Sequence, residues 1–148
     1  MLENTNSFNV PNINSNNAIT KEIIYEIDSK TFEKLKKDLQ NEIFLCVCSG
    51  GTTSSCARDN FITLDLRKNY GNIFLNKITG IVSIGGGVVM GDLLNYLKKE
   101  HLFFPSGLSK LPGVGFILTG GVSPLSRKYG LAIDNLEYIN GYLGNGKY

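Results

Sequence analysis

The sequence predicts an α+β fold, and three stretches of the 148-residue chain support that prediction. Residues 22–49 have the pattern of a strand, a helix and a second strand, which is typical of a parallel βαβ unit. Residues 72–76 and 80–86 are short apolar runs joined by a turn, which predicts a pair of strands. Residues 91–102 carry apolar side chains at helical spacing and predict an amphipathic helix.

The βαβ unit begins with the β-branched run EIIYEI, residues 22–27, which predicts its first strand. Asp28 or Ser29 can then cap a helix over residues 31–40, TFEKLKKDLQ. The second strand, residues 43–49, is a nearly continuous apolar run, IFLCVCS. Such a run is expected of a parallel strand that is buried on both faces.

The later elements have weaker patterns. FITLDL, residues 61–66, alternates between apolar and polar residues and predicts a third strand. Residues 103–130 predict mostly loop around the short apolar patch FIL, and residues 136–148 predict a strand followed by the turn GNGK. The helix predicted over residues 91–102 is expected to direct four side chains toward the core: Leu93, Leu94, Tyr96 and Leu97.

Composition narrows the class of protein. Residues 1–20 are rich in asparagine and lack apolar periodicity, which predicts a disordered or loosely packed arm before a folded part over residues 21–148. The formal net charge of +2 is too small to indicate a nucleic-acid or membrane partner. No apolar run approaches the roughly 20 residues of a membrane span, and no signal-peptide pattern is present. We therefore expect a soluble, cytoplasmic protein.

The three cysteines do not predict a metal site. Cys46, Cys48 and Cys56 lack the paired C-x2-C spacing of a closed zinc site, and the one histidine, His101, lies far along the chain. A disulfide is disfavoured in a reducing cytoplasm. We interpret the three cysteines as small buried hydrophobic residues, and we expect no metal.

The stretch CVCSGGTTSSC, residues 46–56, is the strongest candidate for a binding site. Its two glycines let consecutive amides point into one concavity, and the threonine and serine hydroxyls add donors, so the loop could hold phosphate without a cationic side chain. An ordinary turn after a strand fits this pattern equally well.

A second glycine-rich segment, residues 80–94, imitates a nicotinamide-dinucleotide fingerprint. The third glycine of that fingerprint should stand where the sequence has Met90, and Gly91 comes one residue too late. The acidic residue expected about twenty positions further on is also absent, because that region reads LSKLPG. We therefore favour a glycine-rich corner between a strand and a helix, and nicotinamide binding is a remote alternative.

Six stretches, taken together, resemble the FAD-binding domain of the vanillyl-alcohol oxidase and p-cresol methylhydroxylase (PCMH) superfamily, in particular the berberine-bridge-enzyme-like oxidases. They are SGGTTS (49–54), ITLDL (62–66), IVSIGGGVVMGDLLNYL (81–97), FPSG (104–107), GVG (113–115) and LSRKYGLAIDNL (125–136). The resemblance implies a two-subdomain fold, with a small parallel βαβ subdomain beside a mixed or antiparallel sheet with flanking helices. It also implies that residues 21–148 form the N-terminal part of a flavin domain truncated at its C-terminus.

The resemblance implies which residues bind FAD. The loop after the second strand would wrap the pyrophosphate, and its residues are Ser49, Gly50, Gly51, Thr52, Thr53 and Ser54. A second set would lie along the flavin and the ribityl chain: Pro105, Gly107, Leu108, Ser109, Gly113, Gly115, Thr119, Gly120 and Gly121. Asp134 and Asn135 would lie near the cofactor in a mostly structural role, and Ile139 would belong to a strand that meets the adenine end.

The chain also departs from the family. Thr52 stands where many members carry the histidine that bonds to the flavin, and Ser109 stands where some carry a cysteine that bonds to it, so we expect non-covalent FAD. Thr119 and Ser123 replace family glycines, which adds bulk near the cofactor.

The resemblance implies an oxidoreductase that, when complete, oxidises an alcohol, a sugar or an amine by hydride transfer to FAD. The family's substrate domain and catalytic base have no counterpart in these residues, so the catalytic residues are unknown. The chain is expected to be a truncated gene product or one part of a split protein, with a separate chain that supplies the substrate domain. A vestigial or regulatory flavin-binding module without turnover is the alternative.

Overall fold

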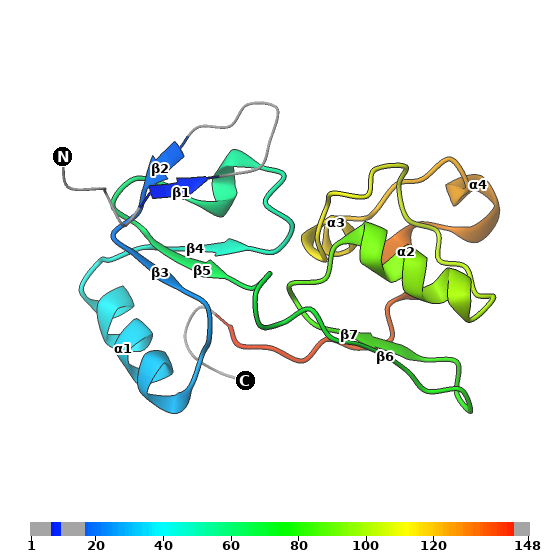
Figure 1. Cartoon of the computed structure of the whole chain (residues 1–148), viewed down its shortest axis with the longest axis horizontal. Helices are drawn as coiled ribbons and strands as arrows, with labels where there is room; N and C mark the ends of the chain where they lie inside the picture. Colours follow the sequence, from blue (N-terminus) through cyan, green and yellow to red (C-terminus); the bar gives the residue numbers. More distant parts are fainter. Residues whose placement is uncertain (1–6, 10–16, 144–148) are drawn as a thin grey trace.

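The structure, a computed structural model, describes residues 7–9 and 17–143. Figure 1 shows two lobes that lie side by side, one formed by the blue to green first half of the chain and the other by the green to orange second half. Within the described residues, no helix has the length and apolar character needed to cross a membrane. The fold is mixed α and β with parallel and antiparallel sheets, as the sequence predicted.

The sheet of the first lobe has three parallel strands in the order β3-β5-β4: β3 (Glu22–Ile24), β4 (Leu45–Cys48) and β5 (Ile62–Asp65). The helix α1 (Ser29–Gln40) connects β3 to β4, which confirms the βαβ unit. Of the two capping residues that the sequence offered, Asp28 begins the helix, because its carboxylate accepts a hydrogen bond from the amide of Thr31 at 2.7 Å.

The burial of the strands corrects one prediction. The apolar run in β4 was expected to be buried on both faces, but β4 lies at the edge of the sheet and Val47 is 51% exposed. The strand β5 was expected to alternate, but it lies at the centre and all four of its residues are buried. Ile62 and Leu64 pack with Leu35 of α1 on one face of the sheet. The physical reason is the order of the strands, which the local pattern does not encode: it places β5 at the buried centre of the sheet and β4 at its edge.

The arm before residue 21 differs in part from the disordered segment that the sequence predicted. β1 (Ser7–Asn9) and β2 (Asn17–Ile19) pair as a two-stranded antiparallel sheet. Ala18 is buried against Cys48, Cys56 and Ala57, and this apolar contact gives β2 a reason to order that asparagine content alone does not reveal. Residues 1–6 and 10–16 of the predicted arm lie outside the described residues.

The cysteines are buried, as the sequence predicted. Cys46, Cys48 and Cys56 are all free thiols that are at most 6% exposed. Burial raises the pKa of each thiol, and raises that of Cys48 to about 12. The thiols are therefore protonated at neutral pH, and they act as small packing groups, with Cys48 and Cys56 in one apolar cluster.

The second lobe contains the predicted strand pair and helix. β6 (Ile73–Leu75) and β7 (Val82–Ile84) are antiparallel, and α2 (Met90–Lys99) buries Leu93 and Leu97. Leu94 and Tyr96 are only half-buried. The stretch predicted as loop also contains single helical turns, which short sequence windows do not reveal: α3 (Gly115–Leu118), α4 (Ser126–Tyr129) and the 3-10 turn η2 (Ala132–Asn135). A similar turn, η1 (Ser54–Cys56), follows β4 in the first lobe.

The prediction of a strand after residue 135 is wrong for residues 136–143, which have no regular secondary structure. A strand requires a hydrogen-bonded partner, and no strand pairs with this segment within the described residues. The segment instead runs from the second lobe to α1 (Figure 1), where the ring of Tyr142 lies 4.8 Å from that of Phe32. Ile139, expected in a strand, is therefore 63% exposed in an irregular segment. The predicted turn GNGK lies outside the described residues.

Thr63 offers a test of the packing in the first lobe. Its side chain is fully buried in β5, and its hydroxyl has no hydrogen-bond partner among the residues that the structure describes. We predict that Thr63→Val raises the free energy of unfolding by about 1 kcal/mol, because a methyl group replaces an unpaired buried hydroxyl. Thr63→Ser, which keeps the hydroxyl and loses the methyl, should lower it. Urea unfolding measures both changes, and a destabilised valine variant would contradict the prediction.

Candidate functional site

Three glycine-rich segments meet around the side chain of Ser49, the first residue after β4. Its hydroxyl donates a hydrogen bond to the carbonyl oxygen of Gly86 at 2.6 Å. The same oxygen accepts a hydrogen bond from the amide of Val114 at 3.0 Å. Ser49 therefore connects the loop after β4 to the segment before α2 and to the segment before α3, so hydrogen bonds of one side chain join the two lobes.

Gly50 and Gly113 lie backbone against backbone. A Cβ atom on Gly50 would lie 2.2 Å from the amide nitrogen of Gly113 and 2.7 Å from the carbonyl oxygen of Leu111. A Cβ atom on Gly113 would lie 2.3 Å from the amide nitrogen of Gly50. A side chain at either position would therefore collide with the backbone of the other glycine. This contact supplies a packing reason for the bare loop, in addition to the approach of phosphate that the family resemblance implied.

The segment that carries Gly113 is held in place by α2. The amide of Met90 donates to the carbonyl of Pro112 at 2.8 Å, and the amide of Gly91 donates to the carbonyl of Lys110 at 2.9 Å. Gly113 also forms an isolated antiparallel bridge with Val89. These bonds fix residues 110–113 against the start of the helix, so the loop after β4 contacts a rigid part of the second lobe.

The glycines that imitate a nicotinamide fingerprint have a structural explanation. Cβ atoms on Gly85 and Gly87 would lie 2.2 Å from the carbonyl oxygen of Tyr70 and 2.0 Å from that of Leu66. The amide of Gly87 also donates to Tyr70 at 2.9 Å. The two glycines therefore let the chain turn closely against residues 66–70, which supports the interpretation of this segment as a corner before α2.

The loop after β4 offers unused donors. Within the described residues, the backbone amides of Gly50 and Gly51 donate to no acceptor, and Gly51 is a buried residue with a φ of 71°. The left-handed conformation at Gly51 favours glycine and can turn successive amides toward one point. Adjacent amides without protein partners suit a phosphate group. The amides of Gly50 and Gly51 are therefore candidate donors for a phosphate group.

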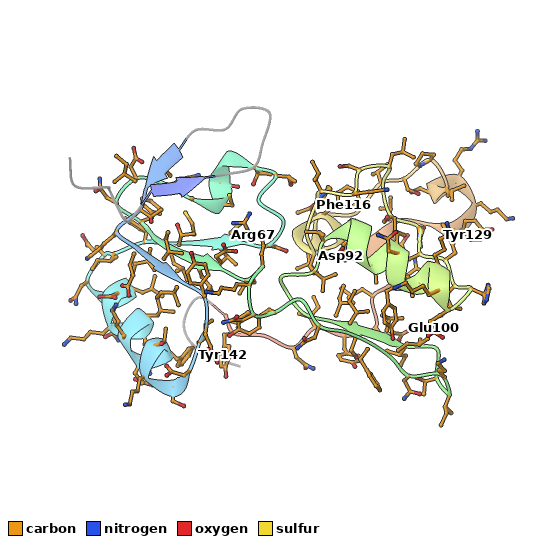
Figure 2. All side chains as sticks on the ribbon, in the orientation of Figure 1. Arg67, Asp92, Glu100, Phe116, Tyr129 and Tyr142 are labelled. Carbon is orange, nitrogen blue, oxygen red and sulfur yellow. The ribbon has the colours of Figure 1, made fainter. Side chains whose placement is uncertain are left out.

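Arg67 adds a charge that the sequence analysis did not assign. Its guanidinium forms hydrogen bonds of 2.9 Å and 2.8 Å with the carboxylate of Asp65, which is 5% exposed, and this bonding raises the pKa of Arg67. The positive charge of Arg67 also partly offsets the effect of burial on the pKa of Cys48 and Cys56. Figure 2 shows Arg67 on the first lobe at the junction. An arginine just after a buried strand was the available signal.

The expected flavin-side residues are only partly brought together. Pro105 is buried, and a Cβ atom on Gly107 would lie 3.0 Å from the ring of Phe116. Leu108 is 87% exposed, and the hydroxyl of Ser109 accepts a hydrogen bond from the amide of Leu111 at 3.3 Å. Leu108 therefore buries little surface in the described residues.

The remaining predicted residues lie in two segments of the second lobe, 119–121 and 131–135, which are hydrogen-bonded to each other. The carbonyls of Gly120 and Gly121 accept hydrogen bonds from Ile133 and Ala132, each at 3.1 Å. The carboxylate of Asp134 accepts the amide of Leu131 at 2.7 Å, and the side-chain amide of Asn135 donates to the carbonyl of Leu131 at 3.0 Å. The hydroxyl of Thr119 donates to the carbonyl of Gly115 at 3.0 Å. The contacts of Asp134 and Asn135 within residues 131–135 suit the structural role that the sequence analysis expected.

Comparisons with known proteins identify the family and the fold of this chain. A family profile described as an FAD binding domain matches residues 39–148. The FAD-linked oxidoreductase janO of Penicillium janthinellum is 35% identical over 104 residues, which are 68% of this chain and 23% of that protein. The crystal structure of 6-hydroxy-D-nicotine oxidase from Arthrobacter nicotinovorans has a TM-score of 0.69 at 31% identity, and the match covers 79% of this chain and 27% of that one.

A third comparison concerns the fold alone. The structure of a variant of the BBE-like 1 protein of Physcomitrella patens has a TM-score of 0.73 at 23% identity, over 84% of this chain and 28% of that chain. The chain spans about a quarter of the length of the relatives that it matches. The profile match covers most of the chain, and the fold is that of the PCMH-type FAD oxidases. This chain therefore belongs to the family of FAD-binding domains found in the FAD-linked oxidoreductases.

Proposed function

We propose that this chain forms the FAD-binding part of an oxidoreductase that, when complete, oxidises an alcohol, a sugar or an amine. The observation that carries the proposal is the loop after β4, where the amides of Gly50 and Gly51 have no acceptor within the described residues. When bound, the flavin would accept a hydride from the substrate. The role of this chain is to hold the cofactor by its diphosphate and to place the flavin against the second lobe.

The loop residues 49–54 would hold the diphosphate through backbone amides, and Arg67, which lies on the first lobe at the junction (Figure 2), would add a positive charge. Residues 105–109 and 113–121 would lie along the flavin and the ribityl chain. The family's substrate domain and catalytic base lie outside the matched stretch, so turnover would require further polypeptide, in the same protein or in a separate chain.

The experiment that tests the proposal is a titration of the flavin-free protein with FAD, followed by flavin fluorescence. We expect a dissociation constant in the micromolar range, which corresponds to about −8 kcal/mol. ADP should compete, because it carries the diphosphate, and riboflavin should not compete through the loop. Failure of FAD to bind at concentrations far above this range would contradict the proposal. Oxidation of a panel of alcohols, sugars and amines by these 148 residues with FAD would show that no further polypeptide is needed.

We predict that the flavin is held without a covalent bond. Thr52 and Ser109 occupy the two positions where the family resemblance places covalent anchors, and neither hydroxyl can replace an imidazole or a thiolate in that bond. Acid precipitation of the flavin-loaded protein should therefore leave the yellow colour in the supernatant. A yellow pellet, or a peptide whose mass is increased by that of FAD, would contradict the prediction.

A further inference from the structure

The hydroxyl of Ser49 is already committed to protein groups. It has one proton, which it donates to the carbonyl of Gly86 at 2.6 Å, and its oxygen accepts the amide of Val114 at 3.0 Å. While these bonds stand, Ser49 has no proton to offer to a phosphate oxygen. We propose that Ser49 is a positioning residue, which holds the amides of Gly50 and Gly51 in place for the diphosphate and does not bind it. The inference rests on the proposed FAD-binding function.

Gly50 and Gly51 depend on this side chain because their own amides form no backbone hydrogen bond within the described residues. The amide of Leu66 donates to the carbonyl of Cys48 at 2.9 Å, and this bond holds the end of β4 just before the loop. Beyond it, Gly50 and Gly51 donate no backbone hydrogen bond within the described part of the chain. Their position is set by close contact with Gly113 and by the two bonds of Ser49.

The absence of a side chain at Gly113 makes room for this arrangement. A Cβ atom there would lie 2.2 Å from the hydroxyl oxygen of Ser49. The space that admits the hydroxyl therefore also admits the backbone of Gly50, and both contacts join the first lobe to the second. Loss of the hydroxyl leaves the carbonyl of Gly86 and the amide of Val114 without this partner, and residues 110–114 can then move away from the loop.

The test compares wild type with Ser49→Ala and Ser49→Cys, using Ser55→Ala as the matched control. The exposed hydroxyl of Ser55 lies 2.8 Å from that of Thr53 in the same loop and contacts neither Gly86 nor Val114. In the flavin-free protein, hydrogen exchange at the amide of Val114 should accelerate about 10-fold in Ser49→Ala, the effect of losing one hydrogen bond. Affinities for ADP and for FAD should fall by about the same factor.

The cysteine variant should give intermediate values in both measurements, because a thiol is a weaker donor and acceptor. It also keeps the test decisive if the alanine variant does not fold. Ser55→Ala should match wild type in both measurements. A loss of ADP affinity with unchanged exchange at Val114 would make Ser49 a direct ligand and overturn the inference. Faster exchange with unchanged ADP affinity would make its role purely structural and also overturn it. Failure of wild type to bind either ADP or FAD would instead overturn the proposed function, and the inference with it.

Discussion

Gly50→Ala is expected to lower the free energy of unfolding of the flavin-free protein by about 3 kcal/mol or more, the upper range for overpacking a core. The added methyl group would meet the amide nitrogen of Gly113 at 2.2 Å, the carbonyl oxygen of Leu111 at 2.7 Å and the carbonyl carbon of Pro112 at 2.8 Å. All three are backbone atoms, so no rotamer change relieves the contact. Residues 110–113 are held by α2 through the bonds to Met90 and Gly91, so the strain falls on the junction between the lobes.

Gly115→Ala is the matched control. A Cβ atom on Gly115 would meet nothing within 4 Å, and the residue begins α3, where alanine is favoured over glycine by up to about 1 kcal/mol. The control should therefore be as stable as wild type or more stable. Urea unfolding without flavin separates the two explanations for the bare loop. If Gly50→Ala lowered FAD affinity and left stability unchanged, phosphate approach alone would explain the glycine, and the described contact would be wrong.

Arg67→Met should also be strongly destabilising, by about 3 kcal/mol. Asp65 is 5% exposed, and its carboxylate accepts two hydrogen bonds from the guanidinium, at 2.9 Å and 2.8 Å. Removal of the arginine would leave this buried carboxylate without its cationic partner, which costs far more than the loss of an exposed ion pair. The stability of Arg67→Lys should fall between those of wild type and Arg67→Met, because a lysine keeps the positive charge but cannot form the two-point contact.

The double variant Asp65→Asn, Arg67→Met provides the control for this prediction. It removes the buried negative charge together with its partner, so it should recover most of the stability that Arg67→Met loses. Thermal or urea unfolding of wild type, Asp65→Asn, Arg67→Met and the double variant gives the coupling between the two side chains. If the double variant were as unstable as the sum of the two single changes, the pair would not act as a unit, and the effect of Arg67 would have to come from its packing.

The sequence alone determined the features that depend on neighbouring residues. The apolar periodicity predicted α1, α2 and the pair β6–β7, because helix and strand repeats are local patterns. Asp28 was a recognisable cap, since a cap bonds to an amide only three residues away. The motifs also sufficed to identify the cofactor family, which the profile match over residues 39–148 bears out.

The tertiary structure decided what depends on residues far apart in the chain. The order β3-β5-β4 exchanged the centre and the edge of the sheet, and the lack of a pairing strand within the described residues left 136–143 irregular. The partners of Gly50 and Ser49 lie in the second lobe, at Gly113, Gly86 and Val114. A glycine has the same letter whether it makes room for a phosphate or for another backbone. Only the chain that lies against it distinguishes the two, and that contact forms when the lobes meet.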